Sequence, residues 1–503
     1  MVFLQTLRQF IHRALSPITQ GRGRWSPALL AIAALGLVVA SGWRSPAQAN
    51  EVRYHDELTF PPLREIILPD YERYTLPNGM VVYLQENHEL PLIEGQAYIR
   101  TGSRWEPVRQ TGLAGITGDL MRSGGTTEHS ANDLARLLES RAAYIESGIG
   151  TSSGSLSLGG LTEDFDFVLG LAAEVLRQPA FPGDRLELSK KQISGGIARR
   201  NDNPNGIASR EFAKLIYGDS SPYARTIEYS TLDAITRDNV VDFYDQYVTP
   251  NHIILGLSGD FDIASAKELI AKHFGDWQPT PTQLPPVPDA TQATQSGTYI
   301  VDRPQLTQSS VRLGHISGLA SSEDYPALSV MNNILNGFGG RLFNELRSRQ
   351  GLAYSVYGYW SAEFDYPGIF LAGGQTRTEG TAAFINGIRK EIDRLRTGPL
   401  TEEELNYAKD LTLNSFVFRF ATPFQVLSRL MTYEYYDYPS DFLFQYQQGI
   451  KDATVADVKR VAKTYLNPDQ LVTLVVGNKE AIAPLLSSKS LEEIDVTIPS
   501  PTS

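Results

Sequence analysis

The pattern of hydrophobic and polar positions is repeated in two parts of the chain. Thr236 to Gly259 and Thr454 to Gly477 each predict a capped amphipathic helix, a turn at a proline and a short apolar strand that ends at glycine. The two segments align without a gap at an offset of 218 residues, and five positions are identical. Chance similarity is the alternative, but the shared order of cap, turn and glycine favours an internal duplication.

Shorter periodicities predict helices and strands in both halves. Pro77-Asn78-Gly79 predicts the turn of a hairpin, and Ser130 with Asp133 predicts the capped start of a helix. Because helices and strands occur in both halves, we expect an α+β fold with two homologous domains, each a mostly antiparallel sheet with helices packed on one face. The expected strands are 72–76, 80–85, 155–159, 252–258, 309–316, 353–360 and 470–476, and the further expected helices include 164–178, 184–203, 324–336 and 341–350.

Differences in composition divide the chain into segments. Gln278–Gly297 contains five prolines and many Thr, Gln and Ser residues, which predicts an extended linker. We expect a signal peptide at 1–49, an N-terminal extension at 50–70, a first domain at 71–277, the linker at 278–297, a second domain at 298–490 and a tail at 491–503.

Residues 1–49 carry the features of an export signal. They contain five arginines and no acidic residue, then an apolar run from Ala28 to Ala40, and then Ala47-Gln48-Ala49. The apolar run has 13 residues, fewer than the roughly 20 that a spanning helix needs. We therefore expect cleavage near Ala49, no membrane span afterwards, and an exported protein in the periplasm. An uncleaved N-terminal anchor is the alternative.

The charge and the absence of cysteine exclude several classes of protein. The formal charge is −12, and removing the five arginines of the signal makes it −17. Nucleic acids and anionic membranes attract basic surfaces, so neither is an expected partner. With no cysteine, the chain has no disulfide, no thiolate metal site and no cysteine nucleophile.

Three motifs occur in an order and spacing that resemble one known family. Gly112-Leu-Ala-Gly-Ile-Thr-Gly-Asp-Leu120 is followed by Arg200-Asn-Asp-Asn-Pro204, and the second half contains Leu342-Phe-Asn-Glu-Leu-Arg347 with Gly351-Leu-Ala-Tyr354-Ser. The chain resembles the insulinase, pitrilysin and mitochondrial-processing-peptidase family over nearly all of its length after residue 49. The resemblance implies two insulinase-type domains that form half of a clam-like chamber.

The zinc motif of this family is degenerate in the chain. Active relatives read G-L-A-H-x-x-E-H, whereas here Gly115 replaces the first histidine, Gly118 the glutamate and Asp119 the second histidine. By resemblance, the third ligand falls at Gly195 or Gly196, and we take Gly196. A metal-bound water needs imidazole ligands and a carboxylate base, and no two of the seven histidines are three to five residues apart. We expect no metal in this chain.

The glycines of the degenerate motif have two explanations. Glycine inside a helix costs roughly 1 kcal/mol relative to alanine. Drift at a site without chemical demand is one explanation, and room for a partner or a peptide to approach is the other. The sequence does not separate them.

The second domain retains a pair of residues that, in relatives, binds the substrate backbone and helps to polarise the scissile carbonyl. Arg347 and Tyr354 match the spacing of that pair, and guanidinium and phenol groups can stabilise charge on an oxygen. The alternative is structural: Arg347 would complement a helix C-terminus and Tyr354 would be a half-buried strand residue. The tyrosine-rich segment 433–438 also has two explanations. Its tyrosines could contact a peptide or a partner, or they could pack in the core, and we favour packing.

Three hypotheses for function follow. The first is a non-catalytic subunit of an exported zinc metallopeptidase, whose partner would carry H-x-x-E-H and zinc while this chain donates Arg347 and Tyr354 for hydrolysis of unfolded peptides. The second is a pseudopeptidase that binds peptides or assists assembly without a catalytic partner. The third, a hydrolase with a relocated site, has no supporting motif such as G-x-S-x-G.

Overall fold

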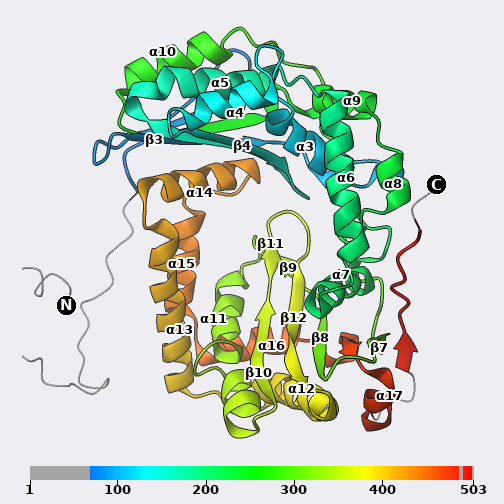
Figure 1. The fold of residues 1–503 in the computed structure, drawn as a ribbon. Helices are drawn as coiled ribbons and strands as arrows, with labels where there is room; N and C mark the ends of the chain where they lie inside the picture. The colour runs from blue at the N-terminus through cyan, green and yellow to red at the C-terminus, as the bar shows by residue number, and fades with distance from the viewer. Residues whose placement is uncertain (1–67, 487–490, 501–503) are drawn as a thin grey trace, which may run out of the picture. The chain divides into compact units, whose positions relative to one another are not determined.

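Two six-stranded sheets organise the chain in the computed structural model, which describes residues 68–486 and 491–500 (Figure 1). These residues belong to one compact unit. The first sheet has the order β1-β2-β6-β3-β5-β4, and only β2 and β6 are parallel neighbours. Its strands are β1 (Glu72–Thr75), β2 (Val81–Glu86), β3 (Leu92–Ile99), β4 (Tyr144–Ile149), β5 (Gly154–Leu161) and β6 (Ile253–Gly259).

The second sheet repeats this plan in the order β10-β12-β8-β13-β7-β14. Strands β13 and β7 are parallel, as β6 and β2 are in the first sheet, and β14 adds a second parallel pair. A separate parallel pair joins β9 (Gly318–Leu319) to β11 (Ala362–Glu363). The strands of the second sheet are β7 (Gly297–Asp302), β8 (Gln308–Ile316), β10 (Ala353–Trp360), β12 (Ile369–Arg377), β13 (Val472–Gly477) and β14 (Leu491–Glu493).

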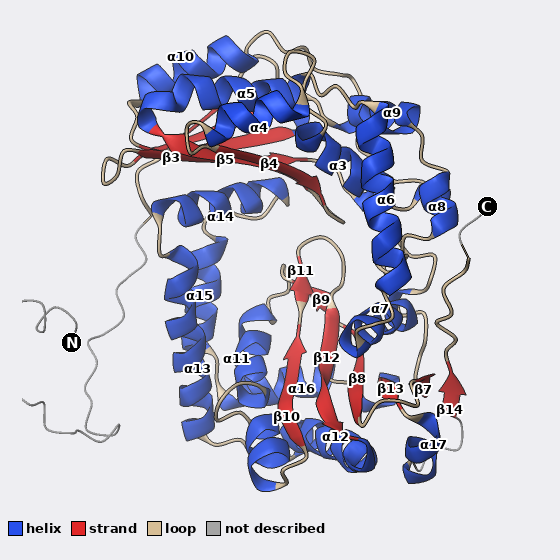
Figure 2. Cartoon of the chain, in the orientation of Figure 1, coloured by secondary structure: helices blue, strands red, loops and turns tan. Residues whose placement is uncertain are grey.

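Each sheet has one face covered by helices of its own half (Figure 2). Side chains alternate between the two faces of a strand, so Ile93 and Ala97 of β3 are buried in the helical layer while Glu94 on the other face is exposed. The first half contains α3 (Leu113–Ser123), α4 (Ala131–Glu139), α5 (Phe165–Arg177), α6 (Gly183–Arg199), α8 (Tyr229–Asp233), α9 (Arg237–Tyr247) and α10 (Ile263–Phe274). The second half contains α11 (Tyr325–Leu335), α12 (Thr381–Thr397), α13 (Glu402–Val417), α15 (Phe442–Asp452), α16 (Val455–Tyr465) and α17 (Lys479–Ile482).

The two halves exchange one helix each. Helix α14 (Pro423–Tyr435) packs through Leu427 and Met431 against the first sheet, on the face opposite its own helices. Helix α7 (Pro204–Tyr217) packs through Phe212 and other apolar residues against β8 and β13 of the second sheet. The two helices lie at the same offset of 218 residues, since 217 corresponds to 435. The duplication therefore extends to the helices that join the halves.

Polar contacts also hold α14 on the first sheet. The Arg73 guanidinium donates to the Glu434 carboxylate at 2.8 Å, and the Tyr83 hydroxyl donates to the same carboxylate. The Tyr435 hydroxyl donates to the Ser152 carbonyl at 2.7 Å. Because Tyr433 and Tyr435 are buried, these two tyrosines of the segment 433–438 pack in the core.

The α+β class with two domains is confirmed, and most predicted elements are present. The hairpin forms around Gly79, which adopts φ +90°, and the Ser130 hydroxyl caps α4 by accepting the Asp133 N–H. The expected helix 184–203 ends at Arg199, because Asn203 caps the next helix, which starts at Pro204. Of the predicted linker 278–297, residues 278–296 contain no helix or strand, and Gly297 begins β7.

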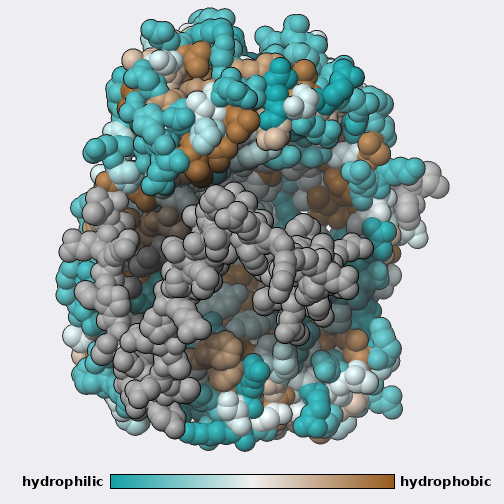
Figure 3. Space-filling model, turned by 60° about the vertical axis from the view of Figure 1, so that its left-hand side comes forward, coloured by the Kyte–Doolittle hydropathy of each residue, from teal (hydrophilic) through white to brown (hydrophobic). Residues whose placement is uncertain are grey.

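The predictions for residues 1–49 lie outside the described residues. Within 68–486 and 491–500, no helix is long and apolar enough to cross a membrane. Hydrophilic residues predominate on the face shown in Figure 3, with hydrophobic residues in small scattered groups.

Candidate functional site

Helix α3 occupies the position of the degenerate motif. It begins after Gly112, whose φ of +107° is in the left-handed region. The Glu106 carboxylate accepts the N–H groups of Gly112 and Ala114 at 3.0 and 2.8 Å, and so satisfies donors that the helix start leaves open. Burial raises the pKa of Glu106, although these two N–H groups and the nearby Arg225 act in the opposite direction.

The three motif positions on α3 have different surroundings. Gly115 and Asp119 are exposed one turn apart on the same side of the helix, and no described atom lies within 4 Å of the place where a Gly115 Cβ would be. Gly118 is buried against β4, where a Cβ would lie 2.3 Å from the backbone nitrogen of Ile149. A side chain would therefore enter open space at position 115 but would overlap closely packed backbone at position 118.

Hydrogen bonds from side chains also hold α3 against β4. The Ser147 hydroxyl donates to the Gly118 carbonyl at 2.6 Å, and the Arg122 guanidinium donates to the Ile145 carbonyl at 3.0 Å. The glutamate that active relatives place at this position has no room unless α3 moves away from β4. Close helix–strand packing is thus a third explanation for Gly118, besides drift and room for a partner.

The residues at the motif do not fit a catalytic zinc ion. Gly196 is exposed on α6, which packs against α3, and no described atom lies within 4 Å of the place that a Cβ at position 196 would take. Gly115 and Gly196 have no side-chain atoms that could bind a metal, and among the described residues the Asp119 carboxylate accepts only the Ser123 hydroxyl, at 3.2 Å. In the described ranges, no group of three or more His, Cys, Asp or Glu side chains is placed to hold a metal ion.

Backbone irregularities bring Arg347 and Tyr354 together in the second half. Arg347 lies in a π-helix, Phe343–Arg349, rather than in a regular α-helix. Gly351 ends it in the left-handed region at φ +60°, and its N–H donates to the Arg347 carbonyl at 3.2 Å. Tyr354 is the unpaired residue of a β-bulge between β10 and β12. Isolated π-turns and β-bulges often occur at functional sites.

The Arg347 guanidinium contacts two aromatic rings. Its central carbon is 5.1 Å from the centre of the Tyr354 ring and 4.8 Å from that of Phe343. Cation–π contacts of this kind stabilise the position of the guanidinium while its N–H groups stay available. Tyr354 is 84% exposed, so the alternative of a half-buried strand residue is wrong for this side chain.

The neighbouring Arg349 differs from Arg347. Its guanidinium donates to the Glu345 carboxylate at 3.0 Å, whereas no carboxylate lies within 4 Å of Arg347 in the described part of the chain. Phe343 was not predicted as part of this site. Its place four residues before Arg347, one helical turn, is the signal that could have indicated it.

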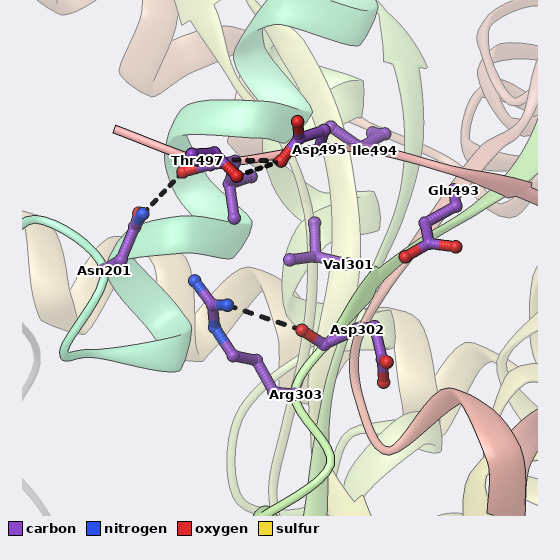
Figure 4. Close-up of a pocket in the computed structure, with 9 residues that line it drawn as sticks. Asn201, Val301, Asp302, Arg303, Glu493, Ile494, Asp495 and Thr497 are labelled. Carbon is purple, nitrogen blue, oxygen red and sulfur yellow. Dashed lines mark hydrogen bonds between the residues drawn. The ribbon is translucent and has the colours of Figure 1, made fainter. Parts of the chain in front are cut away.

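A separate pocket of about 420 Å³ lies beside the C-terminal segment (Figure 4). Arg303 points into it, and the Asn201 amide donates to the Val496 carbonyl at 2.6 Å. The Asp495 carboxylate accepts the Thr497 N–H at 2.8 Å. The Asn201 contact ties the C-terminal segment to the turn after α6, and neither α3 nor the segment 343–354 contributes to the pocket.

Comparison with known proteins identifies the family. The family model for insulinase (peptidase family M16) matches residues 81–221, and the model for the peptidase M16 inactive domain matches residues 234–412. Together they cover more than half of the chain. The chain belongs to the insulinase (M16) family. The predicted family resemblance is therefore confirmed.

M16 relatives include proteins described as proteases and as non-peptidases. The chain is 24% identical over 405 residues to the non-peptidase homolog YmxG of Helicobacter pylori, covering 80% of this chain and 92% of that protein. It is 24% identical over 363 residues to the uncharacterized zinc protease YmxG of Bacillus subtilis, covering 71% and 86%.

A solved M16 structure has the same fold. The crystal structure of a peptidase M16 inactive domain from Pseudomonas fluorescens aligns with a TM-score of 0.74 and 25% identity, covering 81% of this chain and 98% of that one. With the zinc motif lost from α3, the chain is an M16 homologue of the inactive type.

Proposed function

We propose that this M16 chain is the non-catalytic subunit of an exported, heterodimeric zinc metallopeptidase. A homologous partner with an intact H-x-x-E-H motif would hold the zinc and the general base. This chain would complete a clam-like chamber and bind unfolded peptides through Arg347 and Tyr354. The observation that carries the proposal is the contact between the half-buried Arg347 and the exposed Tyr354, in a chain whose α3 has no room for the base.

The chemistry of the pair suits binding to a peptide backbone. The guanidinium and the phenol are donors that would point at the oxygen of a substrate carbonyl, where negative charge develops during hydrolysis. The two rings around Arg347 hold the guanidinium in place before the substrate arrives, so little ordering is needed when it binds. Zinc supplied by the partner would activate water.

The first experiment is affinity purification of the chain from its native host, with zinc analysis and a peptide-cleavage assay on what elutes. We expect a homologous H-x-x-E-H subunit, zinc and cleavage of unfolded peptides. Recovery of the chain alone, with peptide binding but no cleavage, would instead favour the pseudopeptidase hypothesis.

The second experiment tests the role of Arg347 in the recovered complex. Arg347→Ala should lower kcat/KM about 100-fold, the size of effect seen when a donor to a developing oxyanion is removed. Arg349→Ala is the matched control, because Arg349 is already paired with Glu345, and it should leave kcat/KM within about twofold. Equal activity of the Arg347→Ala and wild-type complexes would show that the assisting role is wrong.

Export belongs to the same proposal. The support is the order of charged, apolar and small residues in 1–49. N-terminal sequencing of the protein recovered from the periplasmic fraction should give a start near Asn50. A start at residue 1 or 2 in a membrane fraction would indicate the uncleaved anchor.

A further inference from the structure

A polar pocket of about 350 Å³ lies beside the first turn of α7, on the second sheet. Ser355, Tyr357 and Tyr359 of β10 alternate along the strand and therefore point to the same face of the sheet. Arg312 of β8 and Gln375 of β12 complete this side of the lining. Ser355 directly follows Tyr354, so the pocket begins next to the predicted substrate pair.

Arg312 has no carboxylate partner among the described residues. The buried Arg104 and Arg341, by contrast, pair with Asp365 and Glu404. The Arg312 guanidinium instead donates one hydrogen bond, to the Ser209 hydroxyl at 2.6 Å. Its Nε is buried without a partner in the described residues, and no described carboxylate lies within 4 Å. Since a guanidinium has five N–H donors, it keeps capacity for an anionic ligand.

The rest of the lining is rich in donors and contains no acidic residue. The side chains of Ser355, Tyr357, Tyr359 and Gln375 have no hydrogen-bonding partner in the part of the chain that the structure describes. The side-chain oxygen Oδ1 of Asn205 accepts the Ser310 hydroxyl at 2.8 Å, which leaves the Asn205 NH₂ group to donate. Burial raises the pKa of Tyr357, so its phenol keeps its proton at neutral pH.

We propose that this pocket, built around Arg312, binds a carboxylate of a peptide. Arginine with neutral donors around it matches a carboxylate, which accepts two parallel N–H bonds from a guanidinium. The Tyr357 and Tyr359 rings, with centroids 6.0 Å apart, give an apolar surface for the residue that carries or precedes the carboxylate. The proposal rests on the proposed function only in taking a peptide as the ligand, and it needs no partner subunit.

The test is binding of fluorescein-labelled alanine–serine peptides to the purified chain, measured by fluorescence anisotropy. One pair of peptides has the same sequence and ends in either a free carboxylate or an amide. A second pair is amidated and contains one internal glutamate or glutamine. We expect the carboxylate form of at least one pair to bind about tenfold more tightly, as expected for charge-assisted hydrogen bonds. The pair that shows the preference identifies the source of the carboxylate.

Substitutions test whether Arg312 causes the preference for the carboxylate form of the peptides. Arg312→Gln should abolish the preference, and Tyr357→Phe should reduce it about threefold. Arg303→Gln is the matched control, because Arg303 lines the pocket of Figure 4 and also has no carboxylate within 4 Å in the described residues. It should keep the full preference, and thermal melting checks that all variants fold.

Two results would overturn the proposal: equal binding of the acid and neutral peptides in both pairs, or a preference that persists in Arg312→Gln. Failure of the proposed function gives a different result. A chain that recruits no zinc-bearing subunit would still show the Arg312-dependent preference if the pocket binds carboxylates.

Discussion

Helix α3 in the first half and the segment from Phe343 to Tyr354 in the second half differ in how their backbones present side chains. Helix α3 is regular and lies so close to β4 that Gly118 has no room for a Cβ. The second segment is irregular, with a π-helix, a left-handed Gly351 and a bulge at Tyr354. Its irregularities hold Arg347 and Tyr354 together and leave the tyrosine 84% exposed.

The first segment has lost the residues of the zinc motif, whereas the second retains an arginine and a tyrosine at the spacing found in relatives. Replacement of a ligand by glycine at positions 115 and 196 removes donor atoms but leaves the surrounding space open. At position 118, the backbone of β4 occupies the space that a glutamate side chain would need. The contact between α3 and β4 therefore excludes the base. In the second half, the Arg347 guanidinium keeps contact with the rings of Phe343 and Tyr354.

The largest effect is expected for a substitution that disrupts the close packing of α3 against β4. Gly118→Ala should lower the free energy of unfolding by about 3 kcal/mol, because the new methyl group overlaps the backbone of Gly148 and Ile149. Chemical denaturation measures the change. Gly115→Ala is the control on the same helix, where the methyl group meets open space and should stabilise the protein by about 1 kcal/mol. Changes of equal sign and size would contradict the difference between the two positions.

A smaller effect is expected at Tyr354. Tyr354→Phe keeps the ring against the Arg347 guanidinium and removes only the hydroxyl. In the proposed complex, kcat/KM should fall about fivefold, the loss expected for one hydrogen bond, while the melting temperature stays unchanged. If Tyr354→Phe and Tyr354→Ala are both as active as wild type, the tyrosine has no part in binding.

The smallest effect concerns the two exchanged helices. Burial alone would raise the pKa of Glu434 on α14, but hydrogen bonds from Arg73 and Tyr83 outweigh it, and the pKa is lowered below 4.5. Because the folded state lowers this pKa, the stabilisation is present above pH 4.5 and is lost as the pH falls through the folded value.

Glu434→Gln should therefore cost about 1 kcal/mol of unfolding free energy at pH 7 and almost nothing in strong acid. Denaturation of both proteins at several pH values measures this. Glu211, the buried carboxylate of α7, pairs with Arg210 and Lys214 of the same helix rather than with the second sheet. The contact of α14 with its sheet should therefore be the more acid-sensitive of the two. A difference between wild type and variant that is independent of pH would contradict this.

Much of the fold could be predicted from the sequence because its signals are local. The repeat at an offset of 218, the hairpin at Gly79 and the cap at Ser130 each depend on residues close together in the chain. The exchange of α7 and α14 could not be predicted, because an apolar helix face does not show which sheet it covers.

The candidate site was predictable in part for the same reason. The spacing of Arg347 and Tyr354 and the loss of the zinc motif are visible in the sequence. The approach of α3 to β4 and the unpaired Arg312 depend on contacts between distant segments. A glycine in a helix looks the same in sequence whether it faces space, as Gly115 does, or backbone, as Gly118 does.

The measurement that tests the central claim most directly is anomalous X-ray scattering at the zinc edge from crystals of the complex recovered with this chain. The proposed division of labour predicts a zinc peak on the H-x-x-E-H subunit and none beside Asp119 between α3 and α6. A zinc peak at Asp119, or zinc-dependent peptide cleavage by this chain purified alone, would contradict it.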